Sequence, residues 1–326
     1  MEELLQIKNL YVEYRTDRGT AHSVNGIDLI VKKGETLGLV GETGAGKTTT
    51  ALSILQLLPD RVSYIVDGQI MFEGQDLLQL RNAEMRALRG EKISMIFQDP
   101  MTALNPIMTV GDQIKEALLL HTTAAERGDI NQRVDNALEM VGIPKERKGE
   151  YPMQFSGGMK QRVVIAIALA CSPELLIADE PTTALDVTIQ AQVLALIKEL
   201  KVKLGTSVIM ITHDLGVIAQ VCDNVAVMYA GEIVEYGSVQ QIFDLSLPHH
   251  PYTEGLFGSI PNHRKKQRRL DAIQGLMPDP TDLPMGCKFA PRCPYRTELC
   301  GAAQEQQYCG VGHSIRCHLR KGENAL

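Results

Sequence analysis

Length, composition and charge restrict the class of protein first. The chain has 326 residues, 44% of them hydrophobic, and a formal net charge of −6. That length allows one large domain or two smaller ones, and the acidic balance argues against a general nucleic-acid binder. The first ten residues, MEELLQIKNL, lack the basic start of a signal peptide, and no apolar run approaches the roughly 18–20 residues of a membrane span. We therefore expect a cytoplasmic protein, in which clustered cysteines favour metal binding over disulfides.

Short apolar runs alternate with helical stretches over the first 245 residues. A helix is predicted at Lys47–Leu58, ending before Pro59, and the segment from about 100 to 160 is predicted to be a helical insertion because it lacks β-branched runs. Strands that alternate with helices indicate an α/β fold with a parallel sheet. The predicted buried strands are Thr36–Val40, Ile93–Phe97, Leu175–Ala178 and Ser207–Ile211.

The sequence GETGAGKT at 41–48 fits the phosphate-binding loop (P-loop) pattern between a predicted strand and a predicted helix. Its glycines allow the backbone N–H groups to turn inward toward phosphate oxygens, and the helix N-terminus adds a favourable dipole. We expect Lys47 to reach the β- and γ-phosphates of ATP and the Thr48 hydroxyl to bind Mg²⁺. The predicted nucleotide-binding residues of this loop are Gly41, Glu42, Thr43, Gly44, Ala45, Gly46, Lys47, Thr48 and Thr49.

A second part of the predicted site is LLIADE at 175–180, where two acids follow a buried strand. Ligands of open α/β sheets bind at the carboxyl ends of the strands. Asp179 is predicted to hold Mg²⁺, directly or through water, and Glu180 to orient and polarise the attacking water. Two acids after a strand are weak evidence alone, but together with the P-loop they indicate an ATPase.

Four further motifs appear in the order typical of ATP-binding cassette (ABC) ATPases, and residues 4–245 resemble that family. The segments are FSGGMKQR at 155–162, FQDP with Gln98, TALD at 183–186 and ITHD with His213. The resemblance implies a P-loop cassette with a RecA-like core, an N-terminal antiparallel β subdomain and a helical subdomain. It also implies that Gln98 contributes to the Mg²⁺ site and to catalysis, that His213 holds the γ-phosphate and the water, and that Tyr14 stacks on adenine, with Tyr11 as the alternative.

The signature segment departs from the family's LSGGQ at two positions, Phe155 and Met159. Ser156, Gly157 and Gly158 are intact, and in the family these contact the γ-phosphate of an ATP held by the opposite subunit. The resemblance therefore implies a head-to-tail dimer that ATP closes and hydrolysis releases. Because the motif residues are intact, an ATPase that has lost activity and serves only as a regulatory metal-binding module is the weaker interpretation.

Three further segments narrow the resemblance. MIFQDPMTALNP at 95–106, HHPYTEGLF at 249–257 and a cysteine-rich end resemble the ATPase subunits of dipeptide, oligopeptide and nickel importers, the D-type subunits especially. We expect a cassette at 1–245 and a C-terminal extension at 246–326. The resemblance implies a peripheral subunit on the cytoplasmic face of the membrane. Its expected partners are two permease subunits, a sister ATPase or a second copy, and, through the complex, an extracytoplasmic binding protein.

Five of the seven cysteines lie in this extension. Cys287, Cys293, Cys300 and Cys317 match the family's pattern of four thiolates that hold a [4Fe–4S] cluster. Zinc, with His313 or His318 as further ligands, and unligated cysteines are the alternatives, and Cys309 is a spare thiol or a substitute ligand. Cys171 and Cys222 are predicted to be core residues. The basic run HRKKQRR at 263–269 is predicted to be a solvated loop, with contact to anionic lipid head groups as the functional alternative.

The predicted function is thus ATP hydrolysis that powers uptake of dipeptides or oligopeptides. Import of nickel or another metal chelate by the same machine is the first alternative. A soluble ABC ATPase that acts on nucleic acid or ribosomes is the alternative from another class, and one cassette with an acidic balance argues against it.

Overall fold

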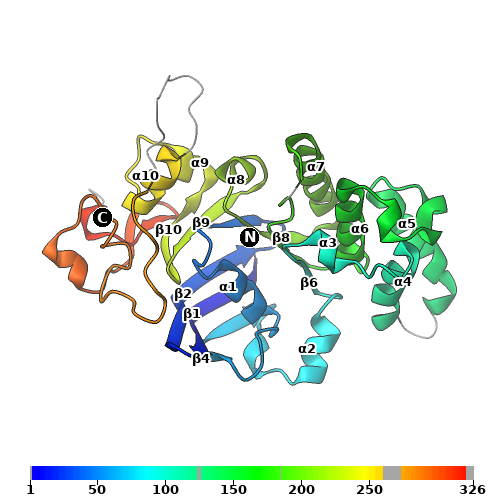
Figure 1. Ribbon diagram of the computed structural model, residues 1–326, viewed down its shortest axis with the longest axis horizontal. Coiled ribbons are helices and arrows are strands. Elements are labelled where there is room, and N and C mark those ends of the chain that lie inside the picture. Colours follow the sequence, from blue (N-terminus) through cyan, green and yellow to red (C-terminus); the bar gives the residue numbers. More distant parts are fainter. Residues whose placement is uncertain (1, 123–125, 184, 260–272, 321–326) are drawn as a thin grey trace. The chain divides into compact units, whose positions relative to one another are not determined.

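The computed structural model describes residues 2–122, 126–183, 185–259 and 273–320 (Figure 1). The basic run at 263–269 and Ala184 of the TALD segment lie outside the described residues. The chain divides into two compact units, which are described one at a time. Unit 1 comprises Met1–Leu4, Val31–Thr36 and Glu73–Thr212, and unit 2 comprises Leu5–Ile30, Leu37–Phe72 and His213–Leu326.

Unit 1 contains three parallel strands, β6 (Ile93–Ile96), β7 (Leu175–Asp179) and β8 (Ser207–Thr212). β7 pairs with β6 on one side and with β8 on the other. Every residue of β7 and β8 is buried, as expected of strands that are covered on both faces. The structure confirms these three predicted strands to within one residue at each end.

Helices of unit 1 lie where the helical insertion at about 100–160 was predicted. α4 (Val110–Leu120), α5 (Ile130–Met140) and α6 (Gly157–Leu169) pack against one another and form the green group in Figure 1. Thr109 begins α4 by accepting a hydrogen bond from the backbone N–H of Asp112. The other regular elements of this unit are β5 (Gln75–Asp76), α2 (Asn82–Leu88), α3 (Pro100–Ala103) and α7 (Val187–Leu204).

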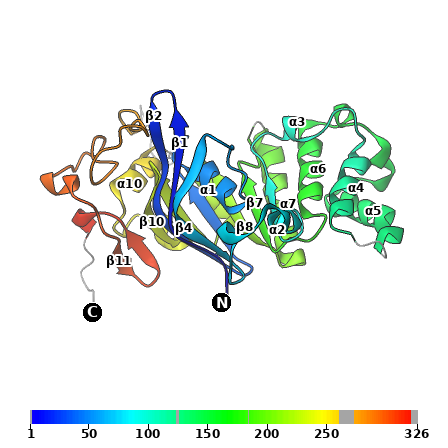
Figure 2. The same ribbon diagram turned by 90° about the horizontal axis from the view of Figure 1, so that it is seen from below.

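Unit 2 begins with long antiparallel strands, β1 (Glu3–Thr16), β2 (Gly19–Lys32) and β4 (Ser63–Phe72), which Figure 2 shows side by side. Their apolar side chains alternate, so one face is buried. The predicted strand β3 (Thr36–Val40) is confirmed, and it pairs in parallel with β9 (Asn224–Tyr229). The helix after it, α1 (Lys47–Ile54), ends four residues before the predicted Leu58, because Gln56 takes a left-handed backbone conformation with φ of 48°.

The C-terminal extension continues the sheet of unit 2, which the sequence did not predict. β10 (Glu232–Ser238) pairs antiparallel with β9, β12 (His313–Ile315) pairs with β10, and β11 (Gln307–Gly310) pairs with β12. Strands of three and four residues between cysteines show too little alternation to be recognised. The remaining helices of the unit are α8 (Leu215–Val221), α9 (Val239–Phe243) and α10 (Pro251–Gly258).

The two cysteines predicted to be core residues are only half-buried. Cys171 follows α6, and Cys222 ends α8. The prediction was wrong about their depth because both lie just past a helix end rather than on its apolar face.

Candidate functional site

The P-loop of unit 2 has a backbone that only glycine can build at two points. A Cβ on Gly41 would lie 2.2 Å from the carbonyl oxygen of Met228, and one on Gly46 would lie 2.5 Å from that of Ser23. Gly46 also has φ of 105° and begins α1. The Nζ of Lys47, a buried residue, donates hydrogen bonds to the carbonyl oxygens of Gly41 at 2.7 Å and Glu42 at 3.0 Å. This is a narrow loop of main-chain groups with a lysine folded along it, a shape that suits a phosphate chain.

Two tyrosines of β1 could serve as the adenine platform, and their positions differ. The Tyr14 hydroxyl donates to Oγ1 of Thr49 on α1 at 3.4 Å, and Ser23 lies 3.0 Å from the same Thr49 oxygen. Tyr11 instead packs its phenol against the backbone of Gly26. Tyr14 is therefore the one beside the helix that follows the P-loop.

Asp179 and Glu180 lie at the carboxyl end of β7 in unit 1. Asp179 is buried, and Glu180 has φ of 47°, a strained value for a residue with a side chain. Gln98 donates to Oε2 of Glu180 at 3.0 Å, and Thr183 donates to the same oxygen at 2.9 Å. The structure therefore brings the predicted catalytic Glu180 and Gln98 together, and two donors keep the carboxylate oriented.

The signature segment begins α6, and part of it is exposed. Ser156 is the N-cap, and its Oγ accepts the backbone N–H of Met159 at 3.4 Å. Ser156 and Gly157 are exposed, and a Cβ on Gly158 would lie 2.5 Å from the side chain of Ile189. The hydroxyl and the free N–H groups of this helix start are thus available to an anion.

The two departures in the signature share one partner, Arg147. The Arg147 guanidinium lies 4.3 Å from the centre of the Phe155 ring and donates to the sulfur of Met159 at 3.4 Å. Glu150 accepts three hydrogen bonds from the same guanidinium, at 3.0, 2.9 and 2.6 Å, and orients it. Phe155 and Met159 are therefore packing partners of one arginine, and Ser156 still begins α6 as its N-cap.

His213 is exposed and directly precedes α8 in unit 2. It lines a cavity of about 330 Å³ together with Gly41, Glu42 and Arg292. His213, which the resemblance implies holds the γ-phosphate, therefore lines the same cavity as the first residues of the P-loop. Arg292, from the C-terminal extension, is a neighbour that the motifs did not indicate.

The four matched cysteines of the extension lie near one another. The pKa of Cys287 is raised to about 11, mainly by burial and to a smaller extent by the charges of Cys300 and Cys317. Burial likewise raises the pKa of Cys293, and the same two thiols add to the effect. Cys287 and Cys300 are also joined by a backbone hydrogen bond of 2.9 Å. Burial, and to a smaller extent the charge of Glu235, raises the pKa of Cys309.

Backbone N–H groups point at three of these sulfurs. Thr297 donates to Sγ of Cys300 at 3.4 Å, and the amides of Phe289 and Tyr295 bond to Cys287 and Cys293. His318 is bonded to Thr297 and Gln304. Such N–H donors stabilise thiolate ligands. Four grouped thiols with oriented donors fit a metal centre that binds thiolates.

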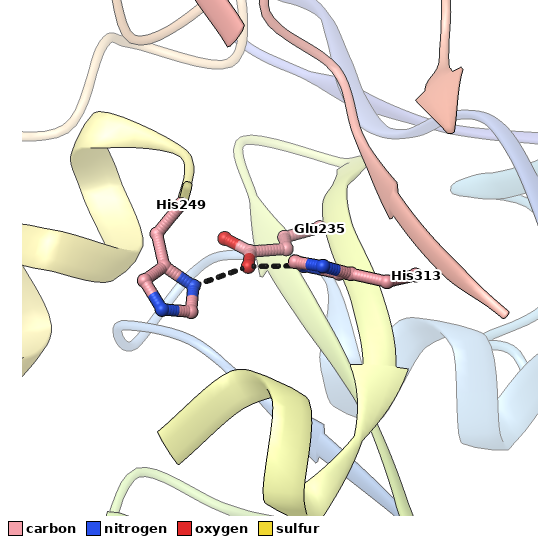
Figure 3. Close-up of side chains that lie close together, drawn as sticks. All are labelled: Glu235, His249 and His313. Atoms are coloured by element: carbon pink, nitrogen blue, oxygen red, sulfur yellow. Dashed lines mark hydrogen bonds and ion pairs between the residues drawn. The ribbon is translucent and has the colours of Figure 1, made fainter. Parts of the chain in front are cut away.

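A buried carboxylate and two histidines join three segments of unit 2 (Figure 3). Both rings point at Oε1 of Glu235 on β10, with His249 Nδ1 at 2.7 Å and His313 Nε2 at 3.0 Å. The other nitrogen of His249 faces the carbonyl oxygen of Asp244 at 3.0 Å. Both neighbours of the His249 ring are acceptors, so the ring donates twice and is an imidazolium. The cluster is thus a buried ion pair that holds β12 of the extension against β10.

The same cluster is the only group of three or more His, Cys, Asp or Glu ligand atoms within 4.8 Å of one another that the described residues contain. Its atoms are already paired as donors and acceptors, which favours a structural role. His313 therefore belongs to this cluster rather than to the cysteines.

The ion pair gives stability a predictable pH dependence. Burial alone would raise the pKa of Glu235, but hydrogen bonds from His249 and His313 outweigh it and lower the pKa to about 2. Burial would lower the pKa of His249, but its bond to Glu235 raises it above 6.5. The Glu235 contribution is present above pH 4.5 and is lost as the pH falls toward 2. The His249 contribution is present below pH 6.5 and is lost as the pH rises through the raised pKa.

We expect the melting temperature to fall between about pH 6 and about pH 8.5, and to fall less in Glu235→Gln, which has no carboxylate to pair with the imidazolium. At pH 6, Glu235→Gln should itself lower the free energy of unfolding by about 3 kcal/mol, because it leaves a buried charge unpaired. Calorimetry and urea titration at both pH values measure these effects. Equal pH dependence in the two proteins would contradict the assignment of an imidazolium.

Solved structures share the fold. The ATP-binding cassette MJ0796, determined as a dimer with ADP and Pi, matches with a TM-score of 0.65 and 26% identity over 72% of this chain and 99% of its own. The cbiO1 protein of Clostridium perfringens, part of the transporter complex cbiONQ, matches with a TM-score of 0.65 and 30% identity over 76% of this chain and 92% of its own. These similarities confirm the predicted P-loop ABC cassette.

Family models and curated relatives identify the family of the chain more narrowly than the solved structures do. Residues 24–183 match the ABC transporter model, and residues 234–300 match that of the oligopeptide/dipeptide transporter C-terminal region. The dipeptide transport ATP-binding protein DppD of Bacillus subtilis is 51% identical, with 100% of this chain and 98% of that protein covered. The oligopeptide transport ATP-binding protein OppD of Haemophilus influenzae is 48% identical, with 98% of each covered. The chain therefore belongs to the ATP-binding subunits of dipeptide and oligopeptide ABC transporters, as its motifs predicted.

The described residues include no helix that is both long and apolar enough to cross a bilayer.

Proposed function

We propose that this protein hydrolyses ATP to drive import of dipeptides or oligopeptides across the cytoplasmic membrane. The observation that carries the proposal is the match to peptide-transport ATPases over the whole chain, extension included. The protein acts from the cytoplasmic face, bound to two permease subunits, and pairs with a sister ATPase or a second copy. An extracytoplasmic binding protein delivers the peptide. The cassette at 1–245 supplies the ATPase, and the extension at 246–326 is specific to this kind of importer.

The chemistry follows from the residues already described. The P-loop amides and Lys47 hold the phosphates, and Tyr14 stacks on adenine. Thr48, Asp179 and Gln98 would hold Mg²⁺, which would neutralise charge on the phosphates. Glu180 accepts a proton from the attacking water, and Gln98 keeps its carboxylate oriented. His213 fixes the water and the γ-phosphate in line.

Ser156, Gly157 and Gly158 act on an ATP bound by the opposite subunit. Their support is the exposed start of α6, which presents a hydroxyl and N–H groups to an anion. Closure of the dimer on two ATP molecules and its release after hydrolysis are the two states that move the permease.

Uptake of a labelled dipeptide tests the proposal directly. Cells that lack the gene should regain uptake with the wild-type protein and not with Lys47→Ala, whose P-loop has lost its only ammonium. Permease subunits should co-purify with both proteins. Labelled nickel serves as the competing substrate. Restored nickel uptake without peptide uptake would move the chain to the nickel importers, and co-purification with RNA or DNA instead of permeases would contradict transport altogether.

The cysteine group of the extension holds a [4Fe–4S] cluster through Cys287, Cys293, Cys300 and Cys317. Thiolates are the usual ligands of such clusters, and three of these sulfurs receive backbone N–H groups. A single zinc with bonds of about 2.3 Å would draw its ligands to within about 4 Å of one another. Among the described residues, no three of these thiols lie within 4.8 Å of one another, which favours a larger centre. When bound, the cluster fixes the four thiolates and so the loops between them.

Anaerobic purification with metal analysis tests the centre. We expect a brown protein with a broad absorption band and about four irons and four labile sulfides per chain. A colourless protein with one zinc would replace the cluster by the zinc alternative and leave the ATPase assignment intact.

A further inference from the structure

Three contacts join the C-terminal extension to the P-loop within unit 2. The Arg292 guanidinium donates to both carboxylate oxygens of Glu42, at 3.1 and 3.0 Å. The Tyr252 hydroxyl of α10 accepts the backbone N–H of Glu42 at 2.9 Å. The Met277 side chain lies over Gly44, since a Cβ there would be 3.2 Å from its terminal methyl group. Glu42 is thus held through its side chain and its backbone by residues more than 200 positions away.

The Arg292 side chain is itself fixed. It is only 6% exposed, its Nε donates to the carbonyl oxygen of Gln274 at 3.0 Å, and its Nη1 also donates to the hydroxyl of Tyr229 at 3.3 Å. The guanidinium carbon lies 5.7 Å from the centre of the Tyr229 ring, which is 4.6 Å from the centre of the Tyr252 ring. The guanidinium therefore contacts an aromatic pair, the platform of Tyr229 and Tyr252, as well as the P-loop.

Phe289 connects the two tyrosines to the cysteine segment. Phe289 is buried, and its ring centre lies 5.2 Å from that of Tyr229 and 5.5 Å from that of Tyr252. It sits between Cys287 and Cys293 in the chain, and Arg292 directly precedes Cys293. Ligation of these cysteines would fix the backbone on both sides of Phe289 and Arg292.

Charge makes this contact relevant to the nucleotide. Glu42 carries a carboxylate within the loop that receives the phosphates, so an unpaired Glu42 would repel them. Arg292 neutralises that carboxylate and holds it 32% exposed beside the cavity that also contains His213.

We propose that the C-terminal extension braces the P-loop through Arg292 and Tyr252, so that ATP affinity depends on the folded, metal-loaded state of the cysteine segment. Arg292 and Tyr252 are positioning residues, because they act on phosphate through Glu42. The inference rests on the proposed ATP site, and it adds a regulatory role to the structural ones that the extension already has.

The test is binding of a fluorescent ATP analogue, with Mg²⁺, to the purified full chain. Arg292→Gln should raise the dissociation constant about tenfold, because the loop loses a charge-assisted pair and keeps the carboxylate. Arg296→Gln is the matched control, an exposed arginine on the same loop, and should bind like the wild type. The double variant Glu42→Gln with Arg292→Gln should recover most of the affinity, which separates repulsion by Glu42 from general damage. Equal affinity of Arg292→Gln and wild type would overturn the brace.

A second comparison tests the link to the metal. Protein stripped of its metal anaerobically should lose affinity for the analogue to about the same extent as Arg292→Gln, and stripping should add little in the Arg292→Gln background. Unchanged affinity after stripping would overturn that link. Should Arg292→Gln fold poorly, Arg292→Lys keeps the charge without the forked geometry and should give an intermediate loss. Failure of peptide uptake would refute the proposed function. The dissociation constants of the ATP analogue would still test whether Arg292 braces the P-loop.

Discussion

Glu180→Gln should lower the rate of ATP hydrolysis at least about a hundredfold and leave ATP binding intact, because a general base contributes about 10²- to 10⁴-fold to such reactions. The amide keeps the shape of the carboxylate, so Thr183 and the P-loop remain undisturbed. It cannot accept the proton of the attacking water. With hydrolysis blocked, ATP should hold the dimer closed. Release of labelled phosphate measures the rate, and sedimentation in the presence of ATP measures the dimer.

Glu199→Gln provides the control, since Glu199 is an exposed carboxylate on α7 of the same unit. It should hydrolyse ATP at the wild-type rate and dissociate after each turnover. Gln98→Ala should give a smaller loss than Glu180→Gln, because it removes a donor that orients the base and leaves the base itself. Normal turnover by Glu180→Gln would remove Glu180 from its assigned role.

The ATPase part of the chain was largely predictable because its chemistry is local. A phosphate-binding loop follows a buried strand and begins a helix, so its residues are consecutive in the sequence. Here the loop follows β3, and Gly46 and Lys47 begin α1. The end of α1 was mispredicted because Pro59 is a visible stop signal, whereas the left-handed Gln56 before it has none.

The contacts of the extension were not predictable for the opposite reason. Glu235, His249 and His313 come from three segments, and Arg292 meets Glu42 at a separation of 250 residues. Each of these residues is ordinary by itself. The one available signal is Glu235 itself, a glutamate within a strand. A carboxylate that is buried requires a compensating charge, so such a residue predicts a cationic partner. The HHPYT segment was recognised only by resemblance. The structure shows that His250 caps α10 and Tyr252 reaches the P-loop.

Cys300→Ser should remove most of the bound iron and loosen the extension, whereas Cys309→Ser should do neither. Cys300 is 5% exposed, its sulfur accepts the N–H of Thr297, and its carbonyl oxygen accepts that of Cys287. A serine hydroxyl is a poor ligand for iron, so three thiolates would remain for a centre that needs four. Cys309 is half-buried and is not one of the four matched cysteines, which makes it a control of the same chemistry.

The extension of Cys300→Ser should lose much of its folding free energy, since binding of a structural metal contributes on the order of 10 kcal/mol to the folding of small domains that depend on one. Iron and sulfide analysis measures the centre, and limited proteolysis measures the order of residues 273–320. We expect Cys300→Ser to be cleaved there quickly, with its ATP-binding cassette still protected. Full iron in Cys300→Ser, or loss of iron in Cys309→Ser, would show that the ligand set has been chosen wrongly. Loss of iron without faster cleavage would mean that β12 and the Glu235 ion pair hold the extension without the metal.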